Sequence, residues 1–183
     1  MATTSPGWSN QDSPRPESGL AEAIGLDPER NRNIDWVVEA LLTLVPTGRP
    51  QVTQAVTRGA ARLLVALGHA PVAEVGLPNG RRADLMALGP RGEILIVEVK
   101  SSPEDYLCDR KWGDYLPYCD SFYFAVGPEF PQALLPREPG LIVADGFGGA
   151  VLREASASRL APARRKALIL AFGRLAAMRS LGD

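Results

Sequence analysis

Two acidic residues and a lysine are spaced so that a β-hairpin would bring them together. Asp84 lies in one apolar-rich run (83–88), and Glu98 lies in a second run (93–99) with Lys100 two residues further on. A Gly-Pro-Arg-Gly sequence separates the runs, as expected for two strands joined by a tight turn. Side chains alternate along a strand, so Glu98 and Lys100 share one face of the sheet. The three charged side chains can therefore form one site.

The residues of the turn decide whether Asp84 joins that face. Pro90 suits position i+1 of a type I turn, and Gly92 suits the left-handed residue that follows. These are the features of a three-residue hairpin loop, which places Asp84 opposite Glu98. A four-residue loop would turn Asp84 to the other face, so the turn sequence favours the first register.

Such a site is suited to chemistry on phosphate. Neighbouring carboxylates oppose each other's ionisation, which a lysine offsets in part and a divalent cation offsets further. Mg²⁺ prefers oxygen ligands, and it can activate water for attack on phosphorus. Lys100 could then hold or deprotonate that water, or bind the phosphate. The alternative is a charged cluster on a solvated sheet face.

Asp84, Glu98 and Lys100 together resemble the signature of the PD-(D/E)XK nuclease superfamily, with Ala83 where a proline usually stands. Within that superfamily the chain resembles the MmcB family of DNA-repair-associated proteins over about 50–180. The segments that carry this resemblance are 101–105, 109–112, 118–126, 140–145 and 163–168. It implies a three-layer α/β, restriction-endonuclease-like core with a mixed central sheet flanked by helices. It also implies a role in DNA repair, with DNA as partner and Mg²⁺ or Mn²⁺ as cofactor.

The chain departs from the superfamily at two further places. A glutamate on the first helix often serves as a further metal ligand, but the helix expected over 52–67 has no acid. Glu74 on the next strand could supply that carboxylate. A helix expected over 103–115 would place Lys111 and Tyr115 in the spacing of the superfamily's QxxxY motif, although the first residue differs.

Several further residues are candidates for DNA contact. Arg81 and Arg82 border the expected site and could bind phosphate, or could simply be solvated. Lys111 could help neutralise the phosphate charge of bound DNA, and Tyr115 could contact the DNA. Trp112 could stack on a base or fill the core. The final helix, expected over 162–181, has a basic side that is either solvated or a DNA-backbone surface.

The chain of 183 residues divides into three parts by composition. Residues 1–32 are polar and Pro-rich, and we expect disorder. Residues 33–50 suggest a short helix and a linker, and the helix, which carries Trp36, could pack on the core or bind a repair partner. Residues 51–183 form the expected nuclease-like domain.

Composition excludes several other classes of protein. A net charge of −1 means that any DNA affinity must come from local patches. Cys108 and Cys119 fit neither a zinc site nor a disulfide scaffold, and we expect reduced thiols in a cytoplasmic protein. The longest apolar stretch, 167–178, is interrupted by Arg174 and is too short to cross a membrane.

The sequence therefore predicts a DNA repair protein that is a divalent-metal-dependent DNA endonuclease. The alternative is a non-catalytic DNA-binding or adaptor protein that keeps the nuclease scaffold. The missing acid on the first helix and the small net charge favour this alternative.

Overall fold

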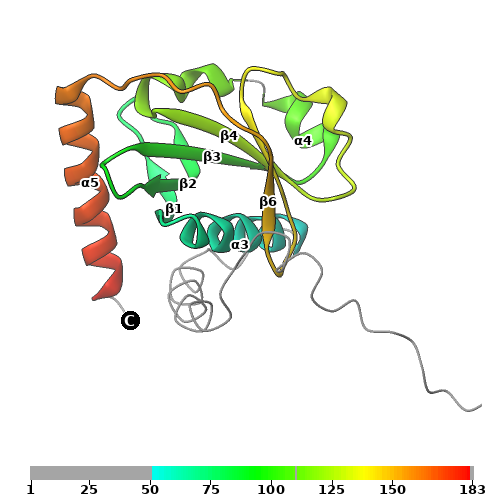
Figure 1. The fold of residues 1–183 in the computed structure, drawn as a ribbon, viewed down its shortest axis with the longest axis horizontal. Helices are drawn as coiled ribbons and strands as arrows, with labels where there is room; N and C mark the ends of the chain where they lie inside the picture. The colour runs from blue at the N-terminus through cyan, green and yellow to red at the C-terminus, as the bar shows by residue number, and fades with distance from the viewer. Residues whose placement is uncertain (1–50, 110, 182–183) are drawn as a thin grey trace, which may run out of the picture.

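The computed structural model describes residues 51–109 and 111–181, which form one mixed sheet with helices on both faces (Figure 1). The tail predicted at 1–32 and the helix and linker predicted at 33–50 lie outside the described residues. The helices are α3 (Gln51–Ala66), α4 (Pro103–Cys108) and α5 (Pro162–Ser180). The strands are β1 (Ala70–Gly76), β2 (Arg82–Leu88), β3 (Ile94–Lys100), β4 (Ser121–Val126), β5 (Gly140–Ala144) and β6 (Gly149–Arg153).

The six strands lie side by side in chain order. Strands β1, β2 and β3 form an antiparallel meander, whereas β3, β4 and β5 are parallel, and β6 returns antiparallel to β5. Helix α3 packs on one face, and α4 and α5 contribute to the core on the other face. This arrangement confirms the predicted α/β fold, with a mixed central sheet flanked by helices.

The turn between β2 and β3 has the predicted geometry. The Gly89 amide donates to the Glu93 carbonyl at 2.8 Å, and the Gly92 amide donates to the Gly89 carbonyl at 3.0 Å. Gly92 has φ +82°, which is the left-handed conformation that glycine adopts without strain. Leu85 pairs with Val97, so the next position along brings Asp84 opposite Glu98. The three-residue loop and its register are confirmed.

Helix α3 has the apolar spacing that predicted it, and Gly68 follows its end with φ +85°. Gly59 lies where the helix meets the β5–β6 turn. A Cβ atom at Gly59 would lie 2.1 Å from the Asp145 carbonyl oxygen and 2.3 Å from that of Gly148. Only glycine allows this close approach.

The helix predicted over 103–115 is much shorter in the structure. Ser102 caps its start by accepting a hydrogen bond from the Asp105 amide at 3.2 Å, as the sequence suggested. The helix ends at Cys108, because Asp109 adopts an extended backbone. Two short 3₁₀ turns, Trp112–Asp114 and Leu116–Tyr118, follow instead.

Aromatic packing explains why the helix is shorter than predicted. Trp112 and Tyr115 both stack on Phe122 of β4, with ring centroids 6.0 and 5.6 Å apart, respectively. The 3₁₀ turns bring both rings onto the same strand residue, and Pro117 has no amide to continue a helix. Lys111 and Tyr115 therefore do not share a helical face.

Helix α5 forms as predicted and is attached near both of its ends. Arg165 pairs with Asp120 at 2.6 Å, next to the start of β4. Arg179 donates to the carbonyls of Ala73 and Glu74 on β1, the second at 3.1 Å. Within the described residues, no helix combines the length and the apolar character needed to cross a membrane.

Candidate functional site

Strands β2 and β3 separate at the two predicted acids. The last backbone pair of the ladder is Leu85 with Val97. Beyond it the Asp84 amide donates to Glu98 Oε1 at 3.4 Å, and the Val99 amide donates to the Asp84 carboxylate at 2.8 Å. Side-chain oxygens thus replace backbone carbonyls as acceptors, which holds the two carboxylates next to each other.

Glu98 and Lys100 are unusually buried for charged residues, with 6% and 5% of their surface exposed. Burial raises the pKa of Glu98 from 4.5 to about 8, and the neighbouring charge of Asp84 adds to this effect. A hydrogen bond with Tyr115 and the charge of Lys100 act in the opposite direction. The site therefore holds a carboxyl group that resists ionisation unless more positive charge is supplied.

The two carboxylates lie at the surface of a cleft of about 490 Å³. Asp84, Glu98 and Lys100 form part of its lining. The other predicted site residues that line it are Arg81, Arg82 and Tyr115. The predicted site residues in this lining thus come from three parts of the sequence: the β1–β2 turn, the β2–β3 hairpin and the turns after α4.

The two arginines of the cleft have different surroundings. Arg81 donates to the Asp114 carboxylate from Nε at 3.0 Å and from a terminal nitrogen at 2.8 Å. The hydrogen bond with Asp114 raises the pKa of Arg81. Arg82 has 64% of its side chain exposed and pairs through Nε with Glu74 at 2.5 Å. Arg81 thus anchors the first 3₁₀ turn, and Arg82 is the arginine more open to a ligand.

Glu74 is outside the lining of the cleft. It has φ +52°, a left-handed backbone that is uncommon for a residue with a side chain. The neighbouring pairs, Ala73 with Leu85 and Val75 with Ala83, continue the ladder on either side. Its side chain is only 7% exposed and is directed to Arg82.

The remaining predicted DNA-contact residues are also placed by the 3₁₀ turns. Lys111 is exposed and Trp112 is partly buried against Phe122, and neither lines the cleft. Tyr115 is buried, and its hydroxyl donates to the Arg82 carbonyl at 3.3 Å. Burial and the nearby Glu98 raise the pKa of Tyr115.

The cleft also contains two acids that were not predicted as site residues. Asp105 and Asp109 line it, and the Asp105 carboxylate accepts hydrogen bonds from the Ser101 amide at 3.0 Å and hydroxyl at 3.2 Å. The Ser-Ser-Pro-Glu-Asp sequence signalled a helix start, but not which acid would face the cleft. Among the described residues, no three His, Cys, Asp or Glu side chains are grouped so that they could hold a metal ion.

Comparisons with known proteins place the chain in a family. The family described as "DNA repair protein MmcB-like" matches residues 42–182. A solved structure of the SPO1766 protein of unknown function from Silicibacter pomeroyi is 47% identical, with a TM-score of 0.69 over 71% of this chain and 89% of that one. No curated protein matches. The family indicates a role in DNA repair, and the chain belongs to the MmcB-like family of DNA repair proteins.

Proposed function

We propose that the cleft hydrolyses phosphodiester bonds in DNA during repair, with Mg²⁺ or Mn²⁺ held by Asp84 and Glu98. The observation that supports this most strongly is the pair of adjacent carboxylates, Asp84 and Glu98, at a buried site beside Lys100, where burial and the charge of Asp84 raise the pKa of Glu98. A divalent cation would supply the positive charge that this pair requires. The resemblance to the PD-(D/E)XK signature points to the same chemistry.

The donor atoms fit such an ion. Mg²⁺ is often bound by one or two carboxylates, with water and phosphate oxygens completing its coordination. The described residues offer no three-residue cluster, so Asp84 and Glu98 would be the protein ligands. When bound, the ion would lower the pKa of a coordinated water and stabilise charge on the phosphate.

The protein's own groups would position the reactants. Hydrolysis forms a bond from a water oxygen to phosphorus and breaks the opposite P–O ester bond, leaving a phosphate end and a hydroxyl end. The Lys100 ammonium would orient the attacking water and offset charge on the phosphoryl oxygens, while one water proton leaves to solvent and the departing oxygen takes up a proton from solvent. Arg82, the more exposed arginine of the cleft, would attract the substrate backbone.

A second function, DNA binding without catalysis, is favoured by a specific observation. Helix α3 contains no acidic residue, and the Glu74 carboxylate, which could have replaced one, pairs with Arg82. A two-carboxylate site binds a cation less strongly than a three-carboxylate site. In that case Asp84, Glu98 and Lys100 are the remnant of a catalytic site on a DNA-binding scaffold.

A calorimetric titration of the full chain with Mn²⁺ distinguishes these two functions. We expect one Mn²⁺ site in the wild type, and loss of that site in Asp84→Asn and in Glu98→Gln. Glu129→Gln is the matched control, because Glu129 is exposed and outside the cleft. Absence of Mn²⁺ binding, with and without DNA, would favour the non-catalytic function.

A further inference from the structure

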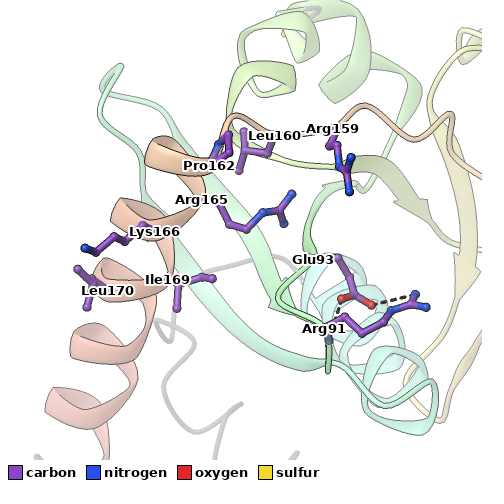
Figure 2. Close-up of a pocket in the computed structure, with 9 residues that line it drawn as sticks. All are labelled: Arg91, Glu93, Arg159, Leu160, Pro162, Arg165, Lys166, Ile169 and Leu170. Atoms are coloured by element: carbon purple, nitrogen blue, oxygen red, sulfur yellow. Dashed lines mark hydrogen bonds and ion pairs between the residues drawn. The ribbon is translucent and has the colours of Figure 1, made fainter.

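A second hollow lies at the other end of β3 from the cleft. It is a groove of about 820 Å³ between the β2–β3 turn and the start of α5 (Figure 2). The turn contributes Arg91 and Glu93, and the segment leading into α5 contributes Arg159. Helix α5 adds Arg165 and Lys166. The groove is thus assembled from segments about 70 residues apart in the sequence.

An ion pair fixes the shape of the groove. Arg165 makes two hydrogen bonds of 2.6 Å to the Asp120 carboxylate and a third, also of 2.6 Å, to the Gly92 carbonyl. Asp120 in turn accepts from the amides of Ile94 at 2.8 Å and Leu160 at 3.0 Å. These contacts join α5, the strand β3 and the hairpin turn, so the backbone on both sides of the groove is held in place.

The groove has more positive charge than its surroundings neutralise. Arg159 and Lys166 are exposed and have no hydrogen-bond or ion-pair partner among the described residues. Among the described residues that line the groove, Glu93 is the one acid, and it pairs with Arg91 at 3.5 Å (Figure 2). Between Glu154 and Asp183 every charged residue of the sequence is basic, although the chain as a whole has a net charge of −1. The positive charge is therefore concentrated on α5 and the segment before it.

We propose that this groove binds the phosphate backbone of DNA at a distance from the cleft. Concentrated, partly unpaired cations are the feature that attracts a polyanion, and the family indicates DNA as the partner. Strand β3 has seven residues and separates the two sites by roughly 23 Å at about 3.3 Å per residue. At about 3.4 Å per base pair, the groove would hold phosphates some seven base pairs from the cleft. This extends the proposed function but needs no catalysis.

Binding of a fluorescent 30-base-pair duplex by the full chain, measured by anisotropy in EDTA over a range of salt, tests the proposal without any cleavage. The double variant Arg159→Gln/Lys166→Gln should bind about tenfold more weakly at low salt. Its slope of log K against log salt should be less steep by about 2, because two phosphate contacts are lost. Glu93→Gln should bind more tightly, since it removes the groove's acid while keeping an acceptor for the Arg91 amide.

Arg137→Gln is the matched control, because Arg137 is an exposed arginine that lines neither the groove nor the cleft. Equal weakening by Arg137→Gln would show a general effect of charge and would overturn the proposal. So would an unchanged salt slope in the double variant. Unchanged DNA binding together with lost binding of a poly-glutamate peptide would assign the groove to an acidic protein partner instead. Asp84→Asn, which tests the cleft, should leave the salt slope unchanged if the two sites are separate.

Discussion

Replacing Glu98 by glutamine should change how the stability of the protein depends on pH. The pKa of Glu98 is about 8 in the folded protein, against 4.5 ordinarily, because the carboxyl is buried beside Asp84. Between these values the folded protein holds a proton that the unfolded chain has released. The free energy of unfolding should therefore fall as pH rises from 4.5 to about 8, and should level off above that.

The magnitude follows from the separation of the two pKa values. Each pH unit between them is worth about 1.4 kcal/mol, so the full interval corresponds to roughly 5 kcal/mol. Glutamine does not titrate, and its oxygen can still accept from the Asp84 amide as Glu98 Oε1 does. We expect Glu98→Gln to be close to wild type at pH 5 and several kcal/mol more stable at pH 8.

Urea unfolding followed by circular dichroism at several pH values from 5 to 9, in EDTA, measures this difference. Glu129→Gln should follow the wild type, because Glu129 is exposed. Parallel stability curves for wild type and Glu98→Gln would refute the argument. If the cleft binds Mn²⁺, the ion should restore stability to the wild type at pH 8, by about 2.7 kcal/mol at one hundred times its Kd, but not to the variant.

Other substitutions test the fold and its chemistry. Gly59→Ala should destabilise by about 1–3 kcal/mol in urea unfolding, because its Cβ would overlap carbonyl oxygens of the β5–β6 turn, whereas Gly173→Ala has open space and should stabilise slightly. Asp120→Asn should lower the melting temperature at pH 7, with a loss of about 2–3 kcal/mol. That loss should shrink as pH falls below 3.8, because hydrogen bonds from arginine and two amides outweigh burial and keep the Asp120 pKa low. A thiol reagent should label exposed Cys108 at once, and Cys119 only after unfolding, since burial raises the Cys119 pKa to about 12.

The central hairpin could be predicted from sequence because local chemistry determines it. Pro90 and Gly92 specify a three-residue loop, and the loop fixes the register of β2 and β3. Strand alternation then places Asp84, Glu98 and Lys100 together. No contact distant in sequence was needed for this part of the site.

The segment after β3 was predicted less well, because distant contacts determine its conformation. The spacing of the side chains in 103–115 suits a helix. In the structure, however, Trp112 and Tyr115 both stack on Phe122 of β4, and this packing favours two 3₁₀ turns. The conformation of Glu74 could not be predicted for the same reason. Its left-handed backbone and its ion pair with Arg82 depend on how β1 pairs with β2.

The groove beside α5 also depends on tertiary structure. A basic side on the last helix was evident from sequence, but which of its cations would be neutralised was not. Arg165 pairs with Asp120, some 45 residues away, while Arg159 and Lys166 stay exposed.

Cleavage of supercoiled plasmid DNA by the full chain in Mn²⁺ tests the proposed nuclease most directly. Wild type and the Arg137→Gln control should nick the plasmid, and Asp84→Asn and Lys100→Met should lose at least about 100-fold in rate while remaining folded. Nicking by Asp84→Asn at the wild-type rate, or no nicking by a wild type that has bound Mn²⁺ and DNA, would contradict the proposal.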